Sequence, residues 1–224
     1  MKHFHFVLLW LIISCILSTL SIRFGTYNIQ SGSNFAHVYN LTETAETINQ
    51  LDVDIIALQE FHFEEMRNFQ NGGYGISILS KQTSIKRLLT YHYNNTTAEQ
   101  CVIPKEGDYC QGFILIEIPF KYQDNIDLSI YFGTTHLGIG LNGLQQFNEV
   151  KQIVQWMSDN IININSSNMN GYTFESLRPS KRINYIFMLK SQNFPEQIKF
   201  NCKIQVVPTL SSDHRPVVLN FNLL

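Results

Sequence analysis

The sequence predicts an α/β domain in which helices cover the outer faces of mixed sheets. Short runs of β-branched and aromatic residues recur along the chain, and two longer segments carry apolar residues at helical spacing. Strands and helices alternate early in the chain, and strands dominate later. The chain has 224 residues, of which 44% are hydrophobic, and no shift in composition divides it. We therefore expect one domain with a substantial core.

The first half of the chain begins with an expected strand at 22–29, which is followed by a helix. The apolar face of that helix is formed by Leu41, Ala45, Ile48 and Leu51, with Thr42 and Glu43 near its start. A second strand covers 54–59, where four consecutive apolar residues indicate burial on both sides. A third strand covers 75–79.

The second half contains expected strands at 111–118, 128–134, 183–189 and 217–221. A helix lies between the second and third of these strands. Its apolar face is formed by Leu144, Phe147, Val150, Val154 and Met157. We therefore expect mixed sheets with one helix in each half of the chain.

Residues 1–21 have the pattern of a secretory signal peptide. A basic start precedes the apolar run Phe6 to Leu20, and small residues follow. The run is shorter than the about 20 apolar residues of a membrane span. We expect a mature domain at 22–224, secreted or in the lumen of the secretory route, with no membrane span after cleavage. An uncleaved N-terminal anchor is the alternative.

The cysteines and asparagines fit that compartment. Cys101 and Cys110 bracket a polar, turn-rich segment, so we expect a disulfide between them, with Cys202 as a buried free thiol. Glycan acceptor sequences begin at Asn40, Asn94, Asn95 and Asn165. The formal net charge of -2 gives no general attraction for nucleic acid.

Polar residues stand at or just after the ends of several expected strands. Asn28 lies near the end of the first strand, Glu60 follows the second, and His136 follows the strand at 128–134. Asp213 and His214 precede the last strand. A sheet can direct such side chains into one cleft. A carboxylate that binds a divalent metal and a histidine that contacts a phosphoryl oxygen suit the hydrolysis of phosphoesters.

The order of these motifs resembles the endonuclease/exonuclease/phosphatase superfamily, which includes deoxyribonuclease-I-like enzymes, neutral sphingomyelinases and inositol polyphosphate phosphatases. The resemblance extends over nearly all of the chain after Ser21, with motifs at 24–29, 54–60, 74–81, 135–137, 182–186 and 212–216. It implies a four-layer α/β sandwich of two mixed sheets with outer helices.

The resemblance also implies a role for each polar residue. Glu60 would bind the catalytic Mg²⁺, or Mn²⁺, with Asp213 near the metal. Asn28 would hold a metal-bound water or a phosphate oxygen. His136 would donate to the phosphate or the leaving oxygen, and His214 would contact the scissile phosphate. The implied partner is a phosphoester from nucleic acid, phospholipid or sugar phosphate, without an obligate protein partner.

Two features depart from the family pattern. The Gly-Asp-x-Asn motif, whose Asp orients or deprotonates the attacking water, is absent between Trp156 and Gly171, where Asp159 is the only acid. The domain would then lack one core strand, either because a segment is missing from this sequence or because the protein has diverged. Asn184 stands where the family has an Asp that hydrogen-bonds the last histidine, so His214 would lose support for its protonated form.

Two hypotheses follow for the function. The leading one is a secreted, Mg²⁺-dependent phosphodiester or phosphomonoester hydrolase. The rival is a catalytically impaired family member that acts as a binding module or relic. His37, His62 and His92 match no motif, and we expect them to be surface or packing residues; Asp52 and Asp54 are expected in structural roles.

Overall fold

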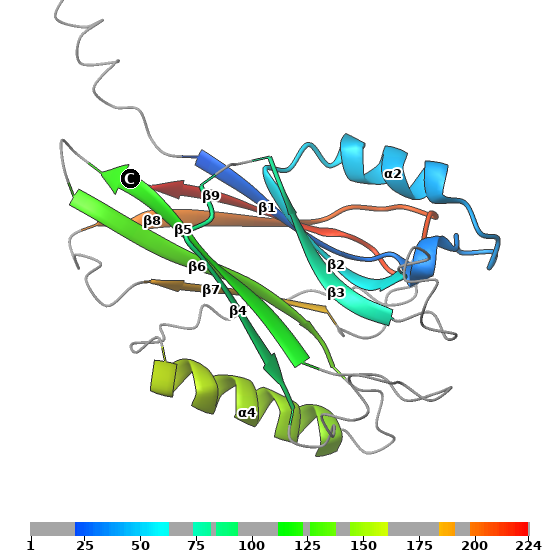
Figure 1. Cartoon of the computed structure of the whole chain (residues 1–224). Coiled ribbons are helices and arrows are strands. Elements are labelled where there is room, and N and C mark those ends of the chain that lie inside the picture. Colours follow the sequence, from blue (N-terminus) through cyan, green and yellow to red (C-terminus); the bar gives the residue numbers. More distant parts are fainter. Residues whose placement is uncertain are drawn as a thin grey trace, which may run out of the picture.

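The computed structural model describes residues 21–62, 74–81, 84–93, 112–122, 126–137, 144–160, 184–190 and 198–223. Within these residues two β-sheets pack face to face, and one helix covers the outer face of each sheet (Figure 1). The layers therefore run helix, sheet, sheet, helix. The expected signal peptide, Cys101, Cys110 and three of the glycan acceptor sequences lie outside the described residues.

The first sheet is mixed, as expected, and has five strands in the order β3-β2-β1-β9-β8. Its strands are β1 (Ser21–Asn28), β2 (Ile55–His62), β3 (Tyr74–Ser80), β8 (Phe200–Val206) and β9 (Val217–Leu223). Only β1 and β2 pair in parallel, because helix α2 (Leu41–Gln50) carries the chain back between them. A short 3-10 turn, η1 (Gln30–Gly32), leads out of β1.

The second sheet has four strands in the order β4-β5-β6-β7, and every neighbouring pair is antiparallel. Its strands are β4 (Arg87–His92), β5 (Gly112–Tyr122), β6 (Ile126–His136) and β7 (Asn184–Lys190). The prediction of a mixed second sheet was therefore wrong. The described strands β4, β5 and β6 follow one another in the chain as neighbours in the sheet, an order that suits antiparallel pairing.

Strand β6 has a hydrogen-bonded neighbour on each side along its second half. Residues 130–136 pair with all of β7, and residues 126–135 pair with β5. Among the described residues, β7 is the next element after helix α4 (Leu144–Asn160). No further strand can therefore lie beside β6 along the stretch that β7 occupies.

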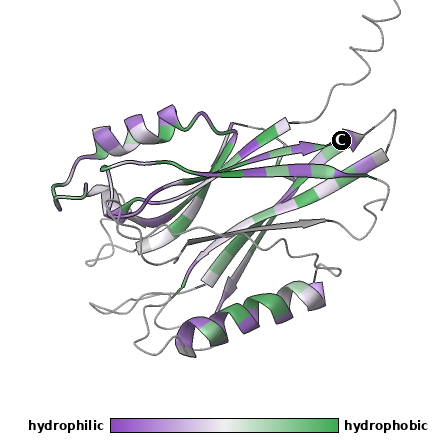
Figure 2. Cartoon of the chain, turned by 180° about the vertical axis from the view of Figure 1, so that it is seen from behind, coloured by the Kyte–Doolittle hydropathy of each residue, from purple (hydrophilic) through white to green (hydrophobic). Residues whose placement is uncertain are grey.

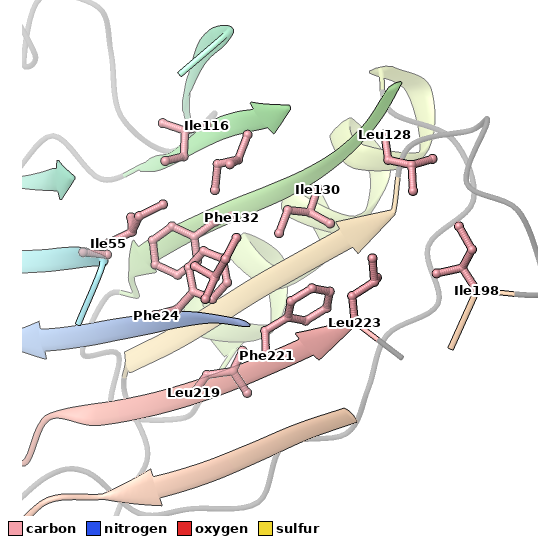
Figure 3. Close-up of a cluster of buried hydrophobic side chains, with 13 residues drawn as sticks. Phe24, Ile55, Ile116, Leu128, Ile130, Phe132, Ile198, Leu219, Phe221 and Leu223 are labelled. Atoms are coloured by element: carbon pink, nitrogen blue, oxygen red, sulfur yellow. The ribbon is translucent and has the colours of Figure 1, made fainter. Parts of the chain in front are cut away.

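The main core lies between the two sheets (Figure 3). Phe24 of β1 stacks on Phe132 of β6, with ring centroids 4.7 Å apart, and both side chains are fully buried. Such aromatic pairs add about 0.5–1.5 kcal/mol beyond the burial of their area. Two smaller clusters lie between the sheets and their outer helices, one against α4 and one against α2.

Each helix buries only part of its predicted apolar face, namely Ile48 and Leu51 on and just after α2, and Val150 and Met157 on α4. On α2, Leu41 is 50% exposed and Ala45 is exposed, whereas Thr44 is buried and Ile48 packs against the core. On α4, Phe147 and Val154 are exposed, whereas Glu149, Ile153 and Met157 are buried. Figure 2 shows hydrophobic and hydrophilic residues interleaved along both helices. Apolar residues on more than one side made the buried face ambiguous.

Strands β4 and β8 were not predicted. Both lie at sheet edges and alternate exposed with half-buried residues. Such strands carry less continuous apolar sequence than central ones. Cys202 of β8 is a free thiol, as expected, but it is half-buried rather than buried. No helix in the described part of the chain is long and apolar enough to cross a membrane.

Candidate functional site

Strand ends from both sheets bring the predicted polar residues together. In the parallel pair of β1 and β2, Asn28 lies opposite Gln59, so Glu60 follows directly beside it. Gln59 is fully buried, and its Nε2 donates to Thr26 Oγ1 at 2.7 Å and to Thr134 Oγ1 at 2.8 Å. The second of these bonds links β2 to β6 across the core. It thereby positions Glu60 close to the end of β6.

Glu60 occupies a β-bulge. The register between β2 and β3 shifts between Gln59 and Phe61, and Glu60 has a φ of 53°. Its Oε1 accepts a hydrogen bond from Asn28 Nδ2 at 2.7 Å and lies 3.4 Å from His136 Nε2. Two other predicted residues, Asn28 and His136, therefore converge on one carboxylate oxygen of Glu60. A bulge commonly redirects a side chain in this way beside a functional site.

Asn28 is held rigidly. It is fully buried, and its Oδ1 accepts a hydrogen bond from the backbone N–H of Gln30 at 2.9 Å. Its backbone oxygen accepts one from Ser212 Oγ at 2.8 Å. These contacts orient the amide so that Nδ2 points to Glu60. Asn28 thus fixes the carboxylate and links it to the segment that carries Asp213.

The segment before β9 brings Asp213 and His214 to the same region. His214 is 2% exposed, its backbone N–H donates to Ser212 Oγ at 3.1 Å, and its Nε2 lies 3.7 Å from Asp213 Oδ1. Ser211 anchors the segment, because its Oγ is within 2.6 Å of Tyr27 Oη and 2.7 Å of Thr47 Oγ1. The sequence analysis gave Ser211 and Ser212 no function of their own. The sequence does place two serine hydroxyls directly before the Asp213-His214 pair, and this pattern could have indicated that they anchor the segment.

The two histidines are both disposed to be neutral. Burial lowers the pKa of His214 to about 3, and the nearby His136 lowers it further in the same direction. Burial also lowers the pKa of His136, although the charges of Glu60 and Glu149 oppose this. Each neutral imidazole can donate one hydrogen bond to a phosphoryl oxygen and accept another.

Glu149 is a buried acid near the site for which no role was predicted from the sequence. It is fully buried on α4, and its Oε1 accepts a hydrogen bond from Gln145 Nε2 at 2.9 Å. Its charge acts on the pKa of His136. Nothing in the sequence distinguished Glu149 from an exposed helical Glu. It is buried because the side of α4 that carries it faces the sheet.

The carboxylates of Glu60 and Asp213 fit a Mg²⁺ ion. Burial raises the pKa of Asp213, and the charge of Glu60 raises it again. A divalent cation would relieve that repulsion. Among the described residues, no group of three or more His, Cys, Asp or Glu side chains is arranged to hold a metal. Mg²⁺ commonly needs only one or two carboxylates, since waters and substrate oxygens complete its shell. The donors therefore suit Mg²⁺ and not a closed structural site.

The remaining candidates lie as follows. Asn184 is the register partner of His136 in the pairing of β6 with β7, so its backbone is next to the site. Asp159 is exposed on α4, where its Oδ1 accepts a hydrogen bond from Gln155 Nε2. Asp54 has the expected structural role, because its Oδ2 accepts from the backbone N–H of Arg23 at 2.8 Å. His37 is exposed, as expected, and a positive charge on it would lower the pKa of Asp213.

Comparison with known proteins gives a clear structural result. No family model and no curated protein matches the sequence. A humanized D. rerio TDP2 carrying 14 mutations matches with a TM-score of 0.58 and 13% identity, over 90% of this chain and 99% of that one. D. rerio TDP2 complexed with single strand DNA product matches with a TM-score of 0.59, also at 13% identity and with the same coverage.

Truncated TDP2 from Caenorhabditis elegans matches with a TM-score of 0.50 and 15% identity, over 90% of this chain and 98% of that one. At these identities the likeness concerns the fold. It covers nearly all of each chain.

Proposed function

Because the chain has the deoxyribonuclease-I-like fold of the endonuclease/exonuclease/phosphatase superfamily, we propose that it is a secreted, Mg²⁺-dependent phosphoesterase of low turnover. The observation that carries the proposal is the convergence of Asn28 Nδ2 and His136 Nε2 on Glu60 Oε1, with Asp213 and His214 beside them. They come from the ends of β1 and β6, the bulge of β2 and the segment before β9, and together they would make a compact site for a metal and a phosphate.

In this proposal Glu60 and Asp213 hold the metal. Bound Mg²⁺ would stabilise the negative charge that develops on the phosphoryl oxygens. Asn28 keeps the Glu60 carboxylate in place. His214, as a neutral imidazole, would donate one hydrogen bond to a phosphoryl oxygen. His136, whose Nε2 lies 3.4 Å from Glu60 Oε1, would donate its single N–H to the phosphate or the leaving oxygen in place of that contact. The loop that carries Asp213 and His214 is held by hydrogen bonds of the Ser211 hydroxyl with those of Tyr27 and Thr47.

The low turnover follows from what the site lacks. The sequence contains no Gly-Asp-x-Asn motif to activate water. The direct pairing of β6 with β7 supports the interpretation that the core strand for that motif is absent from this sheet. Asn184 brings no negative charge to stabilise a protonated histidine. These observations also favour the second candidate, a protein that binds phosphoesters without hydrolysing them.

The experiment compares the wild type with Glu60→Gln on bis(para-nitrophenyl) phosphate and on single-stranded DNA, because the D. rerio TDP2 structure holds a single strand DNA product. We expect slow hydrolysis that requires Mg²⁺ or Mn²⁺ and that falls at least about 100-fold in the variant. Val154→Ala, an exposed position on α4, is the matched control.

Equal activity of wild type and Glu60→Gln would refute this site. Calorimetry separates the two candidates: Mg²⁺ and phosphorothioate binding that depends on Glu60, without turnover, would establish the binding module. Secretion is tested by sequencing the N-terminus of the exported protein, which we expect to begin after residue 21.

A further inference from the structure

An exposed apolar surface lies on the loop between η1 and α2. We call it the apolar rim, and it consists of Phe35, Val38, Tyr39, Leu41 and Leu210. Their exposed fractions are 36%, 57%, 53%, 50% and 53%, in that order. Most are close in sequence, and Leu210 joins them through a hydrogen bond from Phe35 N to Leu210 O of 2.8 Å. Clustered apolar exposure of this kind marks an interaction site more often than scattered exposure does.

The loop is built so that these side chains stay exposed. Asn34 Oδ1 accepts hydrogen bonds from the backbone N–H groups of Ala36 and Val38, both at 3.0 Å, and Asn34 N donates to Val38 O at 2.9 Å. Asn40 N donates to Gly32 O at 2.7 Å. These bonds hold the backbone in a fixed turn, so the loop cannot fold inward to bury its apolar residues.

The rim adjoins the candidate site. His37 lies in the middle of the rim segment, and its Nδ1 is 3.1 Å from Gln30 Nε2. Gln30 in turn donates its backbone N–H to Asn28 Oδ1. Leu210 directly precedes Ser211 and Ser212, which hold Asp213 and His214. A molecule that covers the rim therefore lies beside Asp213 and the Glu60 carboxylate.

The chain segments that form the rim carry no cationic side chain to attract a polyanionic occupant, and Arg215 is the first cation after them. Residues 28–50 and 207–214, which form the rim and its flanks, contain no lysine or arginine but do contain Glu43, Glu46 and Asp213. Nucleic acid is bound through phosphate contacts with lysine and arginine, and single strands also need aromatic platforms. Three of the five rim side chains are aliphatic. This composition suits the interface of a lipid layer that carries no net charge, where Tyr39 can lie among the headgroups.

We propose that the apolar rim inserts into the surface of a zwitterionic phospholipid layer and that the substrate is a phosphodiester headgroup of that layer. The substrate assignment rests on the proposed phosphoesterase function. A protein bound to the same surface would cover the site, whereas a lipid layer delivers phosphodiesters to it. The leaving group of the reaction would be the headgroup alcohol or the lipid alcohol, with water supplying the hydroxyl that remains on phosphorus.

The first test is co-sedimentation of the mature chain, residues 22–224, prepared without N-glycosylation, with phosphatidylcholine vesicles. Val38→Asp should lower the partition coefficient by about tenfold or more, because a charge replaces an exposed valine that the lipid layer would bury. The matched control is Val154→Asp on α4, which lies on the opposite side of the molecule from α2 (Figure 1) and is 51% exposed against 57% for Val38. Leu210→Asp and Leu88→Asp form a second matched pair, at 53% and 60% exposure. Circular dichroism and thermal unfolding of each variant verify folding.

The outcomes separate the two proposals. Selective loss of vesicle binding in the two rim variants supports the lipid surface, and equal binding by rim and control variants overturns it. Binding that requires anionic phosphatidylserine, or retention of single-stranded DNA that Val38→Asp abolishes, also overturns it. Turnover of bis(para-nitrophenyl) phosphate by the wild type and Glu60→Gln tests the phosphoesterase independently. If that turnover is absent while rim-dependent vesicle binding persists, the surface stands and the substrate assignment fails.

Asn40 gives an orthogonal check. It begins an Asn-Leu-Thr glycan acceptor sequence and lies between the rim residues Tyr39 and Leu41. A glycan there would hold the rim away from a membrane. Protein glycosylated at Asn40 should therefore bind the same vesicles more weakly than the unglycosylated protein, and equal binding would contradict insertion of the rim.

Discussion

Glu60 combines a charged side chain with a backbone conformation that favours glycine. Its φ of 53° is in the left-handed region, which costs an L-residue roughly 1–2 kcal/mol. This backbone strain occurs at the bulge that directs the Glu60 carboxylate toward Asn28 and His136. Strain of this kind at a residue with ordered polar contacts is a feature of functional sites.

This strain gives a test by substitution. Glu60→Gly should be more stable than Glu60→Ala by about 1 kcal/mol, because glycine adopts a positive φ without a Cβ penalty. Urea unfolding in metal-free buffer measures the difference, and both variants lose the carboxylate equally. An alanine variant as stable as the glycine variant would show that the bulge relaxes and stores no strain.

Glu117, a buried acid outside the site, contributes stability that depends on pH. Burial by itself raises the pKa of Glu117, but hydrogen bonds from Lys86 and Ser129 and the charges of Lys86 and Arg87 outweigh it and lower the pKa overall. Glu117 Oε1 is 2.9 Å from Lys86 Nζ. A lowered pKa means that the stabilisation is present above the ordinary value of 4.5 and is lost as the pH falls through the folded value.

We therefore expect Lys86→Met to reduce the free energy of unfolding near neutral pH and to have a smaller effect well below pH 4.5. Guanidinium unfolding of both proteins at about pH 6 and about pH 3 provides the comparison. The same loss at both values would contradict the ion pair as its source.

The sequence predicted the site residues better than their surroundings. These five residues are close together because a rigid scaffold positions them: Asn28 and His136 end β1 and β6, Glu60 lies at the bulge of β2, and Asp213 and His214 precede β9. The neighbours Glu149 and His37 were not predicted, since their proximity depends on a helix rotation and on a loop turn that have no local signature. Residues that act through tertiary contacts cannot be found from spacing alone.

At the scale of elements, α2 depends on Asn40, the residue that directly precedes it and caps it. The Oδ1 of Asn40 accepts a hydrogen bond from Glu43 N at 3.2 Å, and Glu43 Oε2 accepts one from Asn40 Nδ2 at the same distance. Asn40 therefore caps the helix that connects β1 to β2 and that contacts Ser211 through Thr47.

Asn40→Ala should destabilise the protein by about 1 kcal/mol, because an orphan backbone N–H at the helix start loses its acceptor. Asn40→Ser should retain most of the stability, since serine caps nearly as well. Thermal unfolding of unglycosylated protein is the measurement. Equal losses for alanine and serine would indicate that the Asn40 amide acts through Glu43 and not as a cap.

The central strands were predicted from the sequence, and so were the edge strands β3 and β7, but the edge strands β4 and β8 were not. β1, β2 and β6 have long runs of buried residues, which give a strong strand signal. β4 and β8 have one half-exposed face and lie at sheet edges, so their signal is weak. The helix faces were predicted in part: Ile48 and Met157 pack inward as expected, whereas Leu41, Phe147 and Val154 are exposed.

At the scale of the molecule, stability depends on the contact between the two sheets. Phe132→Ala should cost about 3–5 kcal/mol, because it leaves a cavity beside Phe24 in the main core (Figure 3). Phe147→Ala, at a position on α4 that is 66% exposed, should change stability by at most about 0.5 kcal/mol. Denaturant unfolding of the pair tests the assignment, and similar losses would mean that α4 buries Phe147 in solution.

The four-layer arrangement was implied by the motif resemblance, and the structural matches agree with it. The antiparallel character of the second sheet was not foreseen. Pairing direction depends on which strands become neighbours, and the direct contact of β6 with β7 joins segments that α4 separates in the sequence. Local patterns do not encode that choice.

The position of β9 between β1 and β8 has a consequence for the order in which the protein matures. β1, α2 and β2 are contiguous in the chain and can associate early in synthesis. The second neighbour of β1 in the sheet is β9, which is synthesised only after residue 216. Asp213 and His214 directly precede β9 and are therefore also synthesised late. A ribosome-bound chain therefore carries Glu60 long before it has a complete site. The candidate site is therefore complete only when folding is nearly finished.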